Sequence, residues 1–354
     1  MATAETLNYI SQQLNIYWGL CMLIFGIIGA CWNILIFRHY SLRSSSYCTY
    51  MLFVSIASLI HILFSLSDRI IDKGFKIHWT ANSIGWCKIR YYFANCTSLI
   101  TLSFLVLSAI DRLLSTCRQI KWRRLNSVYT ARQICLFFII FWMLITIPTL
   151  MYAKPIQFTS NRRLCSYSSK IWLKIMTYFF NLCCYGIFPW IFMSLFGYLT
   201  LKNIRKIRNR RIGTLPSVVL SRMARIDDQL ASMLFLQIIV CIISSIPFIT
   251  QNIYENLTET IYKDDYRLAQ EFLFLQISHL VFYFNYISMF YVNYVSSPIF
   301  RQLSKQVVLN LFKKQEDISR DITMINHQDS NNRLDKRCIK PFTVQPIVSI
   351  SRVQ

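Results

Sequence analysis

Long apolar stretches alternate with short charged segments along most of the chain. A helix that crosses a bilayer needs roughly 20 mostly apolar residues. Seven stretches meet this requirement, and the third is the least apolar. Their approximate limits are Ile16–Phe37, Cys48–Leu66, Trp86–Leu114, Ile134–Tyr152, Ile171–Leu201, Leu230–Ile249 and Phe272–Val295. One such stretch could be a buried helix of a soluble protein, but seven predict an all-α membrane protein, a seven-transmembrane helix bundle.

The chain is very apolar and also very basic. Hydrophobic residues make up 54% of it and charged residues only 15%, with a formal net charge of +22. Soluble domains contain about a quarter charged residues, and proteins that bind nucleic acid are basic but polar, so neither class fits. The combination is typical of a membrane protein whose cationic residues lie in loops on one side.

The basic residues are divided unevenly between the two sets of loops. The loops after the first, third and fifth spans carry most of them and contain no acid before Asp227. The other loops mix both signs of charge and, in this division, include Asp68, Arg69 and Asp72. The positive-inside rule places the basic loops and the C-terminus in the cytoplasm and the N-terminus outside. We expect a multi-pass protein of the plasma membrane.

The predicted organisation has three parts: an extracellular tail over residues 1–15, a seven-span domain over 16–314 and a disordered cytoplasmic tail over 315–354. Phe300, Leu303, Val307 and Leu311 recur at steps of three or four residues. This pattern predicts a short amphipathic eighth helix at the end of the domain. The Ser and Thr residues of the tail could be phosphorylated and recruit arrestin.

Two features of the outer loops predict covalent modifications. Of the 12 cysteines, only Cys87 and Cys165 fall at or in the loops assigned to the outside. Because the exterior is oxidising, they are expected to form a disulfide, with two unpaired thiols as the alternative. Asn256-Leu-Thr258 matches the glycosylation sequon in the sixth–seventh loop, which predicts a glycoprotein. The alternative is that the site lies too close to the membrane to be used.

Several short motifs occur in order along the spans, each at a characteristic position. They are an Asp-Arg pair at the end of the third span, a Cys 25 residues before that Arg, one proline in each of the fifth and sixth spans, and a tyrosine after the seventh. In this chain they are Asp111-Arg112, Cys87, Pro189, Pro247 and Tyr294-Val-Ser-Ser-Pro-Ile-Phe300. From about Gly26 to Phe312 the chain therefore resembles a rhodopsin-like (class A) G-protein-coupled receptor.

Other positions depart from the pattern of this family. Ser58 stands where many members carry an aspartate that helps to hold sodium. The sixth span reads Ser244-Ser245-Ile246-Pro247, without the family's tryptophan, and only Tyr294 remains of the motif that ends the seventh span. The resemblance therefore indicates a divergent member of the family.

The resemblance implies an activation switch at the cytoplasmic end. Arg112 would pair with the adjacent Asp111 and, in the resting state, with Asp227 of the sixth span. Breaking this lock would let the sixth span move outward and open a pocket for a heterotrimeric G protein. The alternative for Asp227 is that it simply begins a helix, where an acid is favourable.

Two prolines and two tyrosines belong to the same implied switch. Pro189 and Pro247 remove backbone hydrogen bonds, so they are either pivots for the movement or static kinks that shape a pocket. Tyr198 and Tyr294 would contact Arg112 after activation, as in the family. As plain lipid-facing or core-facing tyrosines they would need no further role.

The choice of ligand is narrowed mainly by exclusion. Ala94 lies where amine receptors of this family carry an aspartate, and the seventh span lacks the lysine that binds retinal. The outer half instead offers polar and aromatic candidates for ligand binding at Arg90, Tyr91, Gln251, Gln276 and His279. This mixture suits a peptide, so we expect a neuropeptide-like ligand. The alternative for Arg90 is that it extends to the membrane interface.

The remaining expectations concern partners and other protein classes. The basic inner loops suit a G protein and anionic lipid of the inner leaflet. No cluster of metal ligands and no nucleophile–base pair stands out, so we predict no metal, no cofactor and no enzymatic activity. A transporter or channel, and a receptor-like protein without G-protein coupling, are the alternatives that remain.

Overall fold

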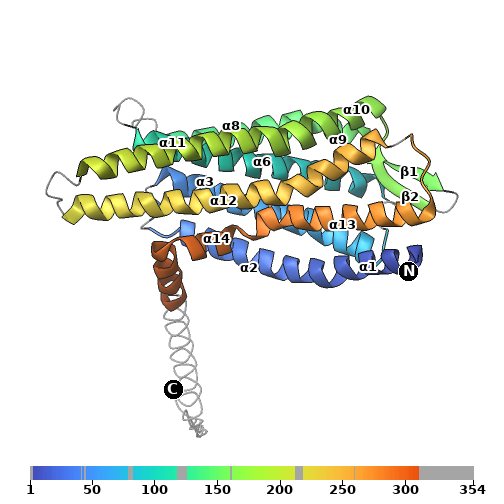
Figure 1. The fold of residues 1–354 in the computed structure, drawn as a ribbon, viewed down its shortest axis with the longest axis horizontal. Coiled ribbons are helices and arrows are strands. Elements are labelled where there is room, and N and C mark those ends of the chain that lie inside the picture. The colour runs from blue at the N-terminus through green and yellow to red at the C-terminus, as the bar shows by residue number, and fades with distance from the viewer. Residues whose placement is uncertain are drawn as a thin grey trace, which may run out of the picture. The chain divides into compact units, whose positions relative to one another are not determined.

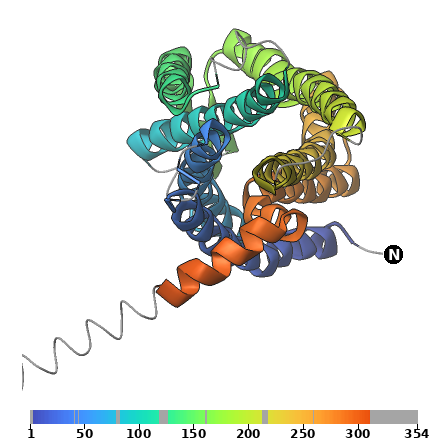
Figure 2. The same cartoon turned by 90° about the vertical axis from the view of Figure 1, so that its left-hand side faces the viewer.

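The computed structural model describes residues 3–40, 42–43, 45–78, 83–117, 126–159, 162–211, 218–258 and 260–310, without the side chains of 157–164 and 207–228. Residues Met1–Ser304 form one compact unit, which is a bundle of long helices (Figures 1 and 2). Six helices are long and apolar enough to cross a membrane, and a bent pair makes a seventh. The prediction of a seven-span α-helical membrane protein is therefore confirmed.

The first four spans are built from helices, and the first two of them include π-helical turns. In chain order these are α1 (Ala4–Gln13), η1 (Leu14–Trp18) and α2 (Gly19–Phe37); α3 (Ser46–His61), η2 (Ile62–Leu66), α4 (Ser67–Arg69) and η3 (Ile70–Gly74); α6 (Ile84–Thr116); α8 (Val128–Ile145) and α9 (Ile147–Tyr152). Ser83 and Ser127 begin α6 and α8, because each hydroxyl accepts a hydrogen bond from the backbone N–H three residues later.

A β-hairpin and three further spans complete the bundle. They are β1 (Ala153–Thr159) and β2 (Arg162–Tyr167); α10 (Lys170–Lys174), η4 (Ile175–Ile187) and α11 (Phe188–Arg211); α12 (Val218–Leu257); α13 (Asp265–Ile287) and α14 (Met289–Ser296). The strands are antiparallel, and Pro155 lies opposite Cys165. This hairpin was not predicted from the sequence.

The first two spans are longer than their apolar stretches. The helical path of the first begins at Ala4, so most of the predicted tail over 1–15 is helix. The second continues to Gly74 and contains Asp68, Arg69 and Asp72, which are only 2%, 6% and 6% exposed. The assignment of these three charges to a loop is wrong. A span predicted from hydropathy ends at the first charged residue. These charges nevertheless lie inside the bundle, because polar groups there are their partners.

The fifth span shows how a helix accommodates its proline. Pro189 is the second residue of α11, directly after the π-helical stretch η4. A proline ring lacks an N–H and clashes with the carbonyl four residues earlier, and the wider π-helix relieves both problems. Pro247 lies inside α12, and a bend of 51° at Ser288 separates α13 from α14.

The chain continues after α14 as a helix over 298–310. Phe300 and Leu303 are buried in the bundle unit, where the Phe300 ring lies 5.6 Å from that of Phe37 and 6.0 Å from that of Phe290. The amphipathic pattern that starts at Phe300 therefore corresponds to a helix in the structure. Residues 311–314 and the predicted tail over 315–354 lie outside the described residues.

Candidate functional site

The bundle has two ends with different chemistry. The disulfide end carries the bond between Cys87 and Cys165, at the first turn of α6 and in β2. The arginine end carries Asp111 and Arg112, near the other end of α6. The helix α6 has 33 residues, and an α-helix rises by about 1.5 Å per residue. The two ends are therefore too far apart to share a ligand.

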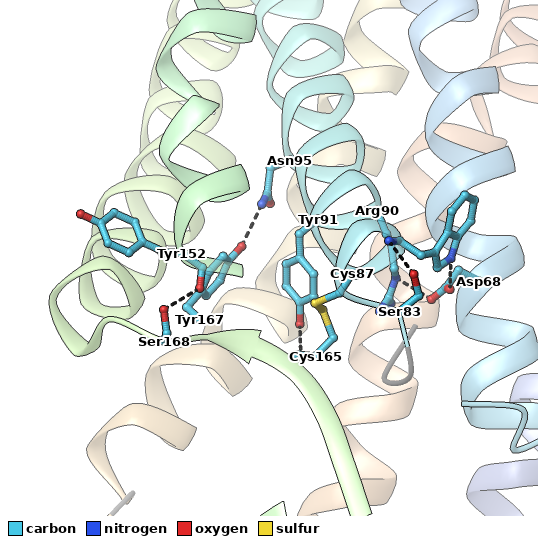
Figure 3. The surroundings of a disulfide bond; sticks show 11 residues. Asp68, Ser83, Cys87, Arg90, Tyr91, Asn95, Tyr152, Cys165, Tyr167 and Ser168 are labelled. Carbon is cyan, nitrogen blue, oxygen red and sulfur yellow. Dashed lines mark hydrogen bonds and ion pairs between the residues drawn. A yellow bond between two sulfur atoms is a disulfide. The ribbon is translucent and has the colours of Figure 1, made fainter. Parts of the chain in front are cut away.

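One face of α6 holds the hairpin at the disulfide end (Figure 3). Cys87, Tyr91 and Asn95 recur every four residues, so they lie on the same side of the helix. Cys87 forms the disulfide, the Tyr91 hydroxyl donates to the Cys165 carbonyl at 2.9 Å, and Asn95 Nδ2 donates to the Tyr167 hydroxyl at 3.0 Å. Burial raises the pKa of Tyr167 well above its usual range, so its hydroxyl stays protonated.

Arg90 lies on α6 beside this face and forms an ion pair with the second span. Its Nε lies 2.5 Å from Asp68 Oδ2, and the Trp86 ring nitrogen donates to Asp68 Oδ1 at 3.3 Å. The side chain of Asp68 is 1% exposed and that of Arg90 18%. The charge of Arg90 is therefore compensated inside the bundle. Sequence reasoning missed Asp68 because it had placed this residue in a loop.

A second polar cluster joins the first, second and seventh spans. Arg69 Nη2 donates to Gln276 Oε1 at 2.7 Å, and Asn15 Nδ2 donates to the same oxygen at 3.2 Å. One turn deeper, the hydroxyls of Ser65 and Tyr283 lie 2.6 Å apart. The structure thus places the predicted Gln276 in a cluster whose other members the sequence analysis did not identify.

The remaining candidates at this end have different surroundings. The His279 ring lies 4.9 Å from the ring of Phe248, which stacks on Phe282 at 4.4 Å. Gln251 is buried on α12, and Ala94 lies on α6. His279 lies on α13, as Gln276 does, whereas Gln251 belongs to the sixth span.

At the arginine end, Arg112 and Asp111 form a buried ion pair. Arg112 Nη2 lies 2.9 Å from Asp111 Oδ2, and the two residues are 4% and 5% exposed. The guanidinium also lies over the ring of Tyr47 in the second span, 4.8 Å from its centroid. The side chain of Asp227 lies outside the described residues, so the Arg112–Asp227 lock stays a prediction.

The family model described as 7 transmembrane receptor (rhodopsin family) matches residues 30–288. This match covers most of the chain and includes both ends of the bundle. The chain belongs to the rhodopsin family of seven-transmembrane receptors. Comparison with curated proteins gives no match. The protein is therefore a G-protein-coupled receptor, from a family that couples an extracellular ligand to G proteins.

In this receptor the two switch tyrosines are both exposed. Tyr198 is 63% exposed and Tyr294 is 37% exposed, and neither has a described hydrogen bond to the arginine. Their contact with Arg112 after activation stays a prediction. Pro189 and Pro247 lie in the expected spans, and their role as pivots is likewise untested.

Neutral hydrogen bonds join the sixth span of the receptor to the seventh near the arginine end. Gln237 Nε2 donates to Asn293 Oδ1 at 3.0 Å. Closer to the end, Gln229 Oε1 accepts from the Ser297 hydroxyl at 3.1 Å and from the Ile299 N–H at 3.0 Å. These residues were not assigned a role from the sequence. Polar residues inside an apolar span were the signal that could have found them.

The glycosylation sequon lies in the last turn of α12, and its polar groups are engaged. Asn256 Nδ2 donates to Thr177 Oγ1 and to the Asn252 carbonyl, both at 3.0 Å. The Thr258 hydroxyl donates to the Tyr254 carbonyl at 2.8 Å. Glycosylation would have to break these bonds, and it stays a prediction. Within the described residues, no group of three or more His, Cys, Asp or Glu could hold a metal ion.

Proposed function

We propose that the receptor lies in the plasma membrane with its N-terminus and disulfide end outside and its arginine end in the cytoplasm. A peptide would bind at the disulfide end, and outward movement of the sixth span at the arginine end would activate a heterotrimeric G protein. The uneven distribution of basic loop residues supports this orientation.

The observation that carries the proposal is the buried pair of Arg112 and Asp111. An arginine within a span is costly unless it is paired or faces water, and such residues usually have a function. Here the pair lies within the last two turns of α6, and the guanidinium of Arg112 lies over the ring of Tyr47 of the second span. Movement of the sixth span would open space beside Arg112 for the G protein, and the surroundings of the pair would then differ between two states of the bundle.

A peptide ligand is supported by the side chains at the disulfide end. Tyr91 and His279 are half-buried aromatic residues, and Arg69, Arg90 and Gln276 provide hydrogen-bond donors there. Ala94 provides no carboxylate for an amine. Aromatic rings combined with a few polar groups are typical of sites for peptides and other medium-sized ligands.

The test is G-protein activation in cells that display the receptor, challenged with a peptide library and a small-molecule library. We expect at least one peptide to activate one class of G protein. An Arg112→Ala variant at equal surface density serves as the matched control and should lose the response. A folded surface receptor that activates no G-protein class, or that conducts ions when purified, would contradict the proposal and favour a channel or an uncoupled receptor.

We also propose two further interactions and one covalent modification on chemical grounds. Lys202, Arg205 and Lys206 at the end of α11 suit anionic lipid of the inner leaflet. Arrestin would bind the phosphorylated tail, which lies outside the described residues. Glycosylation at Asn256 would be visible as a loss of apparent mass after treatment with a glycosidase.

A further inference from the structure

Arg69 is a buried cation without a carboxylate partner among the described residues. It is 6% exposed, and its described polar contact is the neutral amide oxygen of Gln276 at 2.7 Å. The neighbouring acids are already occupied, because Asp68 pairs with Arg90 and Asp72 pairs with Lys73 and His78. A buried charge that lacks an ion pair of its own is unfavourable, so a partner from outside the chain is expected.

The polar atoms of this cluster that have no hydrogen-bond partner indicate the chemistry of that partner. Within the described part of the chain, the buried atoms Arg69 Nε and Gln276 Nε2 are donors without an acceptor. Asn15 Oδ1 is a buried acceptor without a donor. The three residues are joined by hydrogen bonds through Gln276 Oε1, so these atoms lie close together. The complementary group has acceptor oxygens with a negative charge and one N–H beside them.

A carboxylate fits the two donors, because the planar guanidinium of arginine binds carboxylates in a bidentate geometry. An N–H next to that carboxylate fits Asn15. Both groups occur together in an N-acylated amino acid and therefore at the free C-terminus of a peptide. An amidated C-terminus lacks the charge, and a simple fatty acid lacks the N–H.

We propose that the cluster of Arg69, Gln276 and Asn15 binds the free C-terminal carboxylate of the peptide ligand. This inference rests on the proposed function in one respect, the assignment of the disulfide end to the ligand. It replaces Arg90, which Asp68 already compensates, by Arg69 as the cation that recognises the ligand. Arg69 lies five residues before the end of η3, about 7.5 Å below it along a helix, so the peptide end would have to insert to about that depth.

The first experiment needs no ligand. Replacing a buried ion by an apolar residue of similar size is neutral or stabilising when that ion lacks a partner. The melting temperature of purified Arg69→Met receptor in detergent should therefore equal or exceed that of the wild type. A melting temperature lowered as far as in Asp68→Asn, or loss of folded protein in both Arg69→Met and Arg69→Lys, would give Arg69 a structural role and overturn the proposal.

The second experiment uses three small probes at millimolar concentration. N-acetylphenylalanine should raise the melting temperature of the purified receptor, because a ligand that binds only the folded state stabilises it. The amide of N-acetylphenylalanine, which lacks the carboxylate, should not raise the melting temperature. In Arg69→Gln the apparent affinity for N-acetylphenylalanine should fall about tenfold or more. Lys73→Gln, on the same span and paired with Asp72 at a side chain that is itself 26% exposed, is the matched control and should keep the shift.

The third probe, hexanoate, distinguishes the source of the carboxylate. A smaller shift than with N-acetylphenylalanine supports a peptide C-terminus, and an equal shift would assign the site to free carboxylic acids instead. Equal shifts with the free acid and the amide would contradict the proposal. Because no G protein is present, a receptor that fails to signal but passes these tests refutes the proposed function alone.

Discussion

The two ends of the bundle are held together by different kinds of bond. At the disulfide end a covalent bond ties α6 to β2, and the buried Asp68–Arg90 ion pair joins the second span to the third. At the arginine end, the described bonds that join the sixth span to the seventh are hydrogen bonds of neutral groups, such as Gln237–Asn293. Neutral hydrogen bonds contribute about 1 kcal/mol each, so the described contacts between these two spans are the easier ones to break.

This difference separates recognition from movement. A binding site needs fixed side chains, whereas a switch needs contacts that are weak enough to exchange between two states. The charge of Arg112 fits this division, since Asp111 on the same helix moves with it. The arginine can therefore keep a counter-charge while the neighbouring spans rearrange.

The largest effect should follow from loss of the disulfide. In Cys87→Ser the cross-link between residues 78 positions apart is removed, which costs roughly 4.5 kcal/mol in the chain-entropy model. We expect little folded receptor at the cell surface, and a similar loss in Cys165→Ser and in the double variant. Cys31→Ser, at an exposed free thiol, is the control, and an equal loss there would remove the special role of the disulfide.

A somewhat smaller loss should follow from breaking the ion pair at the same end. Asp68→Asn leaves Arg90 buried without its counter-charge, at a cost of about 3 kcal/mol or more. The second substitution in Asp68→Asn/Arg90→Gln should restore part of the melting temperature. Lys73→Gln, whose side chain is 26% exposed, should cost about 1 kcal/mol or less. Additive losses in the double variant would contradict the pairing.

A substitution of Gln237 tests the comparison at the arginine end. Gln237→Leu leaves Asn293 Oδ1 without its donor, which should lower stability by about 1–2 kcal/mol and raise basal signalling. Gln12→Leu is the matched control, because Gln12 Nε2 donates to the Gly74 carbonyl at 2.9 Å at the disulfide end. It should lower stability to a similar extent without changing basal signalling. Equal effects of both variants on signalling would break the comparison.

The smallest change in stability is expected for Asp227→Ala, within about 0.5 kcal/mol of the wild type. If Asp227 locks Arg112 in the resting state, basal G-protein activation should nevertheless rise in this variant. Asp228→Ala provides the neighbouring control and should keep the basal level. An unchanged basal level in Asp227→Ala would count against the lock and leave the residue as a helix-starting acid.

Much of the fold could be predicted from the sequence, because a bilayer demands long apolar helices and the lengths of such stretches are easy to recognise. The pairing of Cys87 with Cys165 followed from the distribution of loop charges. Asp111 and Arg112 were found through their motif. These features depend on local sequence or on a simple rule about compartments.

The polar cluster at the disulfide end could not be predicted in the same way. Hydropathy treats Asp68 and Arg69 as the end of a span, whereas their partners, Arg90 and Gln276, lie on other helices. Asn15 looked like part of a polar tail for the same reason. Long-range pairing of this kind is a property of the packed bundle, and the periodic placement of the polar residues on one helix face was its only local signal.

The most direct test of the different behaviour of the two ends is a pair of distance measurements with spin labels. One label pair, on Cys117 and on Ser232→Cys, reports the separation of α6 and α12 at the arginine end. The other, on Ile89→Cys and Leu257→Cys, reports it at the disulfide end. The other exposed or half-exposed free cysteines among the described residues are replaced by alanine: Cys21, Cys31, Cys183 and Cys184. Cys338, which lies outside the described residues, is replaced as well.

The distances are compared before and after purified nucleotide-free G protein is added. We predict that the distance at the arginine end increases by several ångströms while the distance at the disulfide end stays the same. An unchanged distance at the arginine end in a complex that forms, or an equal increase at both ends, would contradict the account.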